Sequence, residues 1–283
     1  MTDLTLDVYT SPMLELPNGG MFSPTTSTLV LGETEVVLVD TPYLAEHIEQ
    51  VIQRIEASGR RLTTVFITHG HSDHYFGLER LLAHFPQASA VSVASVAAHV
   101  ESNLEADRGF TRDFFAGAAV DNTVGPTALD GDVLLVDGVE LRIIEIEQAD
   151  IAPAAIVHIP SIDAVIAGDA VYNGINPFLA VSGPAEWKKW IESVDRVAAL
   201  NPRIVVAGHK QPWLPDDDLA ASVDATRDYL QAFISGVDHC ANSRELVALM
   251  QNRFPEHGNP SALILSAVNA FKRKKAAMSA SEG

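Results

Sequence analysis

The sequence predicts an α/β fold with a helical extension at its C-terminal end. Short apolar runs such as Glu35–Asp40 (EVVLVD) and Thr63–Thr68 (TTVFIT) alternate with segments of helical spacing such as Leu44–Ser58. Beyond Asp216 the apolar positions follow the helical period alone. We therefore expect one domain over residues 1–215 and a helical extension over residues 216–283 that packs on the same domain.

The first half of the chain alternates strands and helices. Gly59 ends the first predicted helix and Pro86 ends the second. A helical insertion over about residues 96–119 follows, with a break expected near Gly109. The predicted strands are Ser27–Leu31, Glu35–Asp40, Thr63–Thr68 and Ala88–Val93, and the helices are Leu44–Ser58 and Tyr75–Phe85.

The second half begins with strand pairs and ends in helices. An Asp137-Gly138 turn predicts a hairpin, and a second turn lies at residues 160–163. The predicted strands are Val133–Val136, Glu140–Ile146, Ala154–Ile159, Ala164–Ala167 and Arg203–Ala207; the predicted helices are Ala185–Leu200 and residues 217–236, 243–254 and 260–275.

Composition and charge narrow the classes of function. The chain has 283 residues, of which 47% are hydrophobic, enough to form a buried core. Its formal net charge of −18 means that it repels phosphate backbones and anionic membranes. A single cysteine, Cys240, and an N-terminus without the pattern of a signal peptide fit a cytoplasmic location. We expect a small-molecule substrate, and neither nucleic acid nor a membrane as a partner.

Four metal-binding side chains fall within six residues. The segment Thr68-His-Gly-His-Ser-Asp-His74 follows a buried strand directly, and loops at the carboxyl ends of strands are where α/β sheets bind ligands. Neutral imidazoles and carboxylates suit Zn²⁺, and also Fe or Mn. His69, His71, Asp73 and His74 are therefore candidate metal ligands.

Three further strands end in an acid or a histidine. Asp169 ends the run Val165-Ile-Ala-Gly-Asp, His209 ends Ile204-Val-Val-Ala-Gly-His, and Asp40 ends the early strand EVVLVD. Taken singly, such residues are ordinary turn or cap residues. Together with the HxHxDH segment they predict one metal-binding rim.

Over about residues 20–210, these motifs in this order resemble the metallo-β-lactamase-fold superfamily. The resemblance implies a four-layer αββα sandwich, with the helical C-terminal extension added. It implies that His69 and His71 bind a first metal, that Asp73, His74 and His209 bind a second, and that Asp169 bridges both. Asp40 resembles the acid that orients a ligand imidazole from behind.

One position departs from the family's pattern. The family has a further histidine before the strand that carries the bridging acid, and in the stretch Glu145-Ile-Glu-Gln-Ala-Asp150 the corresponding residue is Gln148. An amide oxygen is a weaker ligand than imidazole, so Gln148 predicts a weaker first site. Asp150 is the alternative ligand.

The resemblance implies a metal-dependent hydrolase. We expect one or two Zn²⁺ ions, with Fe or Mn as alternatives, and a metal-bound hydroxide that attacks a lactone, ester, thioester or lactam. Asp73 and Asp169 are the expected catalytic carboxylates. Two other classes stay open: a mononuclear iron dioxygenase of the persulfide-dioxygenase kind, and a metal-poor protein that only binds a ligand.

Aromatic and amide side chains near the motifs are the candidate substrate contacts. Tyr172, Asn173 and Asn176 follow Asp169, while Phe114 and Phe115 end the insertion. Phe110, Phe114 and Phe115 cannot all face one side of a helix, so at least one is expected to line the pocket or contact a second copy in a homodimer. The sequence thus predicts a preference for apolar acyl groups, although these rings would serve equally to dock the insertion on the domain.

Overall fold

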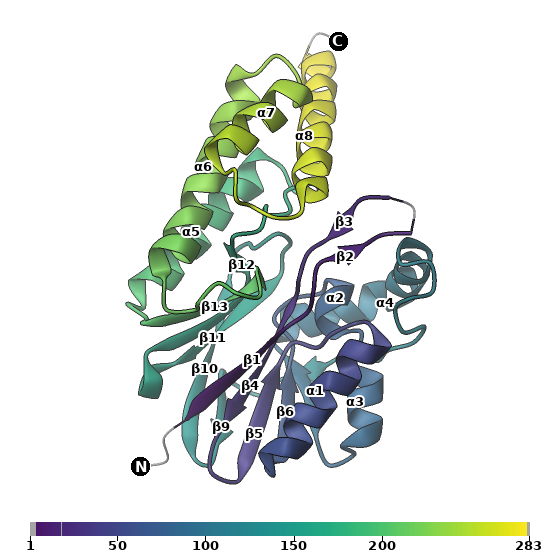
Figure 1. Cartoon of the computed structure of the whole chain (residues 1–283), viewed down its shortest axis with the longest axis vertical. Helices are drawn as coiled ribbons and strands as arrows, with labels where there is room; N and C mark the ends of the chain where they lie inside the picture. The colour runs from purple at the N-terminus through teal and green to yellow at the C-terminus, as the bar shows by residue number, and fades with distance from the viewer. Residues whose placement is uncertain (1–3, 18, 282–283) are drawn as a thin grey trace.

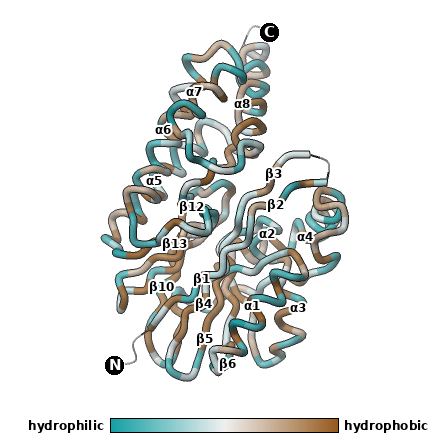
Figure 2. The backbone as a smooth tube through the Cα atoms, viewed as in Figure 1, coloured by the Kyte–Doolittle hydropathy of each residue, from teal (hydrophilic) through white to brown (hydrophobic). Residues whose placement is uncertain are grey.

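The computed structural model describes residues 4–17 and 19–281 and has four layers, with two β-sheets face to face between two layers of helices. This is the αββα sandwich expected from the sequence, with helices added at the C-terminal end (Figure 1). Many strands of the two sheets are strongly apolar, and their hydrophobic residues gather at the interface between the sheets (Figure 2).

The first sheet is built from the N-terminal part of the chain. Its first three strands are antiparallel neighbours, and the pairs after them are parallel. Parallel strands place their carboxyl ends at one edge, which is where the HxHxDH segment emerges. In spatial order the strands are β1 (Thr5–Thr10), β4 (Thr26–Leu31), β5 (Glu35–Val39), β6 (Arg61–Phe66), β7 (Ser89–Ser92) and β8 (Thr127–Ala128).

The second sheet supplies the other half of the rim. The two of its strands that come last in the chain pair in parallel, and the other pairs are antiparallel. In spatial order the strands are β13 (Ile204–Lys210), β12 (Ala164–Asn173), β11 (Ala154–Ile159), β10 (Val139–Ile146) and β9 (Val133–Val136).

Three apolar cores correspond to the three interfaces between layers. Val37 and Phe66 of the first sheet pack against Val157 and Ile166 of the second and are at most 3% exposed. The first sheet is covered by α1 (Ala45–Ser58), α3 (Leu78–His84) and α4 (Ala94–Phe114). The second is covered by α5 (Pro184–Ala199), a π-helical turn (Ala220–Asp224) and α6 (Ala225–His239). Helices α7 (Ser243–Arg253) and α8 (Pro260–Ser281) extend the same core by packing on α6 (Figure 1).

Several elements differ from the sequence-based expectation. Helix α4 continues through Gly109, because this glycine is on an open helix surface and costs only about 1 kcal/mol there. The helix expected over Tyr75–Phe85 is two helices, α2 (Ser72–Tyr75) and α3. Three N-terminal strands were not predicted: β1, β2 (Leu14–Glu15) and β3 (Met21–Phe22).

The C-terminal helices are attached to the second sheet by polar contacts as well as by the core. The Asn176 amide Nδ2 donates to the Gly258 carbonyl at 2.8 Å, and its Oδ1 accepts from the Tyr229 hydroxyl at 2.9 Å. Buried hydrogen bonds of this kind fix the orientation of α6 and α8. None of the helices in the described part of the chain is long and apolar enough to cross a bilayer.

Candidate metal centre

Four chain segments bring the sequence-predicted ligands to one rim between the sheets. His69 and His71 follow β6, Asp73 and His74 lie in α2, Asp169 lies within β12 and His209 within β13. Six residues from three separate parts of the sequence therefore form one cluster, as the motif order implied.

Asp169 lies at the centre of this cluster. Its Oδ1 is 3.2 Å from His74 Nε2, and its Oδ2 is 3.1 Å from His209 Nε2 and 3.8 Å from His69 Nε2. All these side chains are at least nine-tenths buried. Its position between the two groups of histidines is the one required of a bridging carboxylate.

Asp150 occupies the place for which Gln148 was the first candidate. Its Oδ2 is 2.6 Å from His71 Nδ1, and its Oδ1 is 3.7 Å from His69 Nε2. His69, His71, Asp150 and Asp169 together form a group whose ligand atoms could hold one ion. Gln148 is not among the residues that line the cavity, and its backbone N–H donates to Ser193 Oγ of α5 at 3.3 Å. Asp150, two residues on, lines the cavity and faces the histidines.

Asp73, His74 and His209 form a second possible ligand group. Asp73 Oδ2 is 3.4 Å from His74 Nε2 and 3.6 Å from His209 Nε2. The Thr25 hydroxyl donates to the same oxygen at 3.1 Å. The N-terminal strand β4 and the loop before it thus help to orient a predicted ligand, a contact that no sequence motif indicated.

Two histidines, His74 and His209, are oriented by hydrogen bonds at their Nδ1 atoms. Asp40 Oδ2 lies 2.9 Å from His74 Nδ1, and the same carboxylate accepts from the Thr68 backbone N–H and hydroxyl. The Pro24 carbonyl lies 2.8 Å from His209 Nδ1. Each contact fixes Nδ1 as the protonated nitrogen and leaves Nε2 free to bind a metal.

Two glycines allow the strands to approach this closely. Gly168 has a φ of 48°, and a Cβ there would lie 2.8 Å from Thr68 Oγ1. A Cβ on Gly208 would overlap Asp169 Oδ1. Gly168 and Gly208, which directly precede Asp169 and His209 in the sequence, are therefore needed for the packing of the centre.

Several buried polar atoms in the centre lack a hydrogen-bond partner. They are His69 Nε2, His74 Nε2 and Asp169 Oδ1, and all three point into the cluster. An unpaired buried polar group costs about 1–3 kcal/mol, so three at one place need a common partner. Divalent ions satisfy this requirement, and the donor set of imidazoles and carboxylates fits Zn²⁺, Fe or Mn.

Charges within the cluster shift the acid–base equilibria of these side chains. Burial opposes the imidazolium form, and it holds the pKa of His69 well below its ordinary value. Burial also opposes ionisation of His71, but the Asp150 carboxylate raises the pKa of that imidazole to about 9. Despite its burial, the imidazoles of His209 and His74 hold the pKa of Asp169 well below its usual range.

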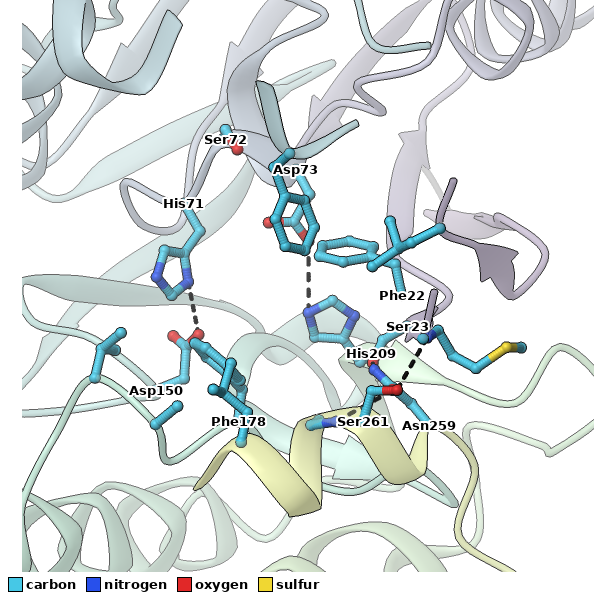
Figure 3. Close-up of a pocket in the computed structure, with 18 of the residues that line it drawn as sticks. Phe22, Ser23, His71, Ser72, Asp73, Asp150, Phe178, His209, Asn259 and Ser261 are labelled. Carbon is cyan, nitrogen blue, oxygen red and sulfur yellow. Dashed lines mark hydrogen bonds and ion pairs between the residues drawn. The ribbon is translucent and has the colours of Figure 1, made fainter. Parts of the chain in front are cut away.

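A cavity of about 520 Å³ opens from the metal-binding cluster. Figure 3 shows Asp150 facing His71 and Asp73 facing His209 along its wall. The remainder of the wall is largely apolar and includes Phe22, Phe110, Phe114, Phe115 and Phe178. The expected aromatic residues therefore do line the cavity, and Phe115 also packs against Tyr43 at a centroid distance of 4.6 Å.

The amide side chains expected to contact substrate have other roles. Asn173 donates to the Pro215 carbonyl at 3.0 Å, and Asn176 holds Gly258 and Tyr229 as described above. Neither lines the cavity in the described structure, because Asn173 is directed toward the loop after β13 and Asn176 toward the C-terminal helices. Tyr172 does line the cavity, and its hydroxyl donates to Asp169 Oδ2 at 2.8 Å.

Phe178, an aromatic residue that follows the Asp169 strand in sequence, also lines the cavity and lies beside His71, with ring centroids 6.2 Å apart. The cavity residues around the start of α8 carried no sequence signal; they are Asn259, Ser261 and Leu265. The α8 residues lie some 50 positions beyond the last ligand in the sequence, so only the folded chain brings them to the site.

Comparison with known families agrees with this architecture. Residues 20–209 match the sequence model of a family described as the metallo-beta-lactamase superfamily. The chain belongs to this superfamily. A comparison with curated proteins finds no match.

Solved structures of the superfamily have the same fold. A metallo-beta-lactamase family protein from Thermus thermophilus is 22% identical, with a TM-score of 0.63 over 96% of this chain and 94% of that one. A metallo-beta-lactamase from Pontibacter korlensis is 18% identical, with a TM-score of 0.61 over 82% of this chain and 99% of that one. The mono-zinc form of FIM-1 from Pseudomonas aeruginosa is 18% identical, with a TM-score of 0.59 over 82% and 96%.

Proposed function

We propose that this protein is a metal-dependent hydrolase of acyl compounds such as lactones, esters, thioesters or lactams. The observation that supports this best is the set of unpaired buried atoms of His69, His74 and Asp169 at the end of a substrate-sized cavity. Membership of a superfamily built around such a centre adds to it.

The first ion would be held by His69, His71 and Asp150, the second by Asp73, His74 and His209, with Asp169 between them. When bound, divalent ions lower the pKa of a coordinated water toward neutrality and polarise a carbonyl oxygen. The structure of FIM-1 is a mono-zinc form, which supports Zn²⁺ as the first metal to test here.

The side chains around the centre orient the reactants and handle protons. Asp73 lines the cavity with its carboxylate held by Thr25, and we assign proton transfer to it. Burial, together with Asp169 and Asp150, raises the pKa of Tyr172 well above its ordinary value, so its hydroxyl stays protonated and donates to Asp169. The Phe178 ring beside His71 keeps water away from one side of the cavity.

One observation favours a second candidate function, a mononuclear iron dioxygenase. With Asp150 in place of an imidazole, the first site offers two histidines and one carboxylate beside the shared Asp169, and two histidines with one carboxylate are a ligand set typical of non-haem iron. The second ligand group argues for two ions and so for hydrolysis.

Metal analysis of the purified protein, combined with a panel of neutral esters, lactones, thioesters and lactams, tests the proposal. We expect metal-dependent hydrolysis of at least one class, lost in a His71→Ala, His74→Ala variant together with the bound metal. Oxygen consumption with iron bound and no hydrolysis would favour the dioxygenase. Full folding with no metal and no turnover would leave a ligand-binding protein.

A further inference from the structure

We propose that helix α8 forms a subsite for the apolar part of a neutral substrate, together with the loop that follows β12. The inference rests on the proposed function only for the reaction, because the subsite itself is defined by the cavity wall. It assigns a role in substrate selection to a helix that lies beyond residues 20–209, the segment that matches the family's sequence model.

Two segments far apart in sequence form this wall. Ala262 and Leu265 come from α8, and Phe178 and Val181 come from the loop after β12. Phe178 lies beside the ligand His71, with ring centroids 6.2 Å apart. An acyl group with its carbonyl at the metal centre can therefore run along Phe178 toward α8.

Hydrogen bonds fix α8 in this position. The Met21 backbone N–H donates to Ser261 Oγ at 2.9 Å, and Asn259 Nδ2 donates to Ser23 Oγ at 2.7 Å (Figure 3). The backbone N–H of Leu179 donates to Ser266 Oγ at 2.9 Å, which joins the loop to the helix. The wall is thus built before a substrate arrives.

Part of this wall and of the facing helix is exposed to solvent despite being apolar. Phe110 is 58% exposed, Val181 52% and Leu265 46%. All three line the cavity, and Phe110 stacks on Phe114 at a centroid distance of 5.1 Å. Because exposed apolar side chains gathered around a cavity are covered when an apolar ligand binds, these residues indicate what the cavity takes.

The charges around the cavity favour a neutral ligand. The described residues that line it include the acids Asp73 and Asp150 but no lysine or arginine. Lys210, which follows a ligand in sequence, is buried in an ion pair with Asp216 at 2.6 Å. An anionic substituent in this subsite would meet no lysine or arginine in the cavity lining and would enter the field of a chain of net charge −18.

A pair of neighbouring residues on α8 offers a matched test. Leu265 lines the cavity, whereas Ile264 does not, and the two are 46% and 48% exposed. Substitution of either by serine removes a similar exposed apolar surface, so we expect similar effects on the free energy of unfolding, which denaturant unfolding of both variants checks. Leu265→Ser and Ile264→Ser should therefore differ only if the subsite binds ligand, and Val181→Ser provides a second variant in the wall.

Binding is measured without any reaction, with the neutral fluorophore N-phenyl-1-naphthylamine and its displacement by neutral alkyl methyl ketones of increasing chain length. We expect affinity to rise about three- to fourfold for each methylene that becomes buried. Leu265→Ser and Val181→Ser should reduce this rise, while Ile264→Ser should retain it. Alkyl chains of the same length ending in a carboxylate should displace the probe poorly.

The hydrolysis of neutral esters from acetyl to octanoyl is then measured on the same variants. A chain-length dependence that is absent, or equal in Leu265→Ser and Ile264→Ser, would overturn the subsite. Tighter displacement by the carboxylates than by the ketones would overturn its preference for neutral ligands. Chain-length-dependent binding without turnover of any ester would instead refute the hydrolase and leave the subsite standing.

Discussion

At the scale of single residues, the centre depends on which carboxylate completes the first ligand group. Asp150 lies 2.6 Å from His71 and 3.7 Å from His69, whereas Gln148 contacts α5 through its backbone. A carboxylate in place of a neutral amide adds a negative charge to the site and so strengthens cation binding. The first site should thus bind its metal ion more tightly than a site with Gln148 as the ligand would.

Asp150→Asn should lower the affinity of the first site for its metal ion, since an anionic ligand becomes neutral. The loss should exceed the roughly tenfold that is typical when a residue hydrogen-bonded to a metal ligand is removed. Gln148→Met, which keeps the side-chain volume and removes the amide, should retain it. Competition with a chelator, followed by metal analysis, measures both. If Gln148→Met lost more metal affinity than Asp150→Asn, Gln148 and not Asp150 would be the ligand of the first site.

The close approach of β12 and β13 leads to a second prediction. In Gly208→Ala the new methyl group would overlap Asp169 Oδ1 and lie 2.6 Å from the backbone of Gly168. We expect a loss of stability of about 1–3 kcal/mol from overpacking, and a loss of bound metal because Asp169 must move. Gly109→Ala, on the open surface of α4, is the control and should be neutral or slightly stabilising. Denaturant unfolding and metal analysis compare the two, and equal behaviour would show that the centre tolerates the methyl group.

At the scale of elements, the C-terminal helices depend on an aromatic stack around His257. This imidazole stacks on Tyr229 at a centroid distance of 5.6 Å and contacts Phe254 at 5.1 Å, between α7 and α8. Burial lowers the pKa of His257 to about 4. The folded protein therefore holds this side chain neutral at pH values at which the unfolded chain protonates it.

This shift predicts how stability depends on pH. Below the ordinary histidine pKa of about 6.5 the unfolded state binds a proton that the folded state does not, so the contribution of His257 is complete above pH ~6.5 and is lost as the pH falls toward ~4. His257→Phe keeps a ring in the stack and removes the titration. The fall in Tm between pH 7 and pH 4.5 should be smaller in this variant than in the wild type. An identical fall in both would assign the acid sensitivity to other groups.

At the scale of the whole molecule, the C-terminal helices and the second sheet share one core. Tyr229, Phe233 and Leu263 belong to the same buried cluster as Val171 of β12 and Trp187 of α5. Removal of the helices would expose this apolar face of the second sheet and one wall of the cavity.

Deletion of residues 217–283 should therefore yield a chain that associates or fails to melt cooperatively, rather than a stable hydrolase domain. Size-exclusion chromatography, dye binding and thermal unfolding of the truncated chain measure this. A monomeric, cooperatively folded truncated protein would show that the extension is a separate domain. Leu246→Ala, a core substitution within α7, is the comparison for simple destabilisation, at about 2–5 kcal/mol.

The sequence alone determined the class of fold and most of the metal-binding residues. Ligands such as His69, Asp169 and His209 lie at or next to the ends of apolar runs, and strand ends at one edge of a sheet must converge, so local patterns are sufficient. The main helices and, apart from the two-residue β8, the paired strands from β4 onward were predicted for the same reason, because hydrophobic periodicity is a local property.

Only the tertiary structure decided which neighbouring residues serve the site. The position of Asp150 beside the histidines depends on how a turn packs against α5. The role of Asn173 depends on the loop after β13, and that of Asn176 on the position of the C-terminal helices. The wall from α8 and the contact of Thr25 with Asp73 join segments with no local signal, because their energy comes from packing between residues distant in the chain. Side-chain direction within a turn and contacts across long loops follow from the completed core, and a one-dimensional pattern does not encode them.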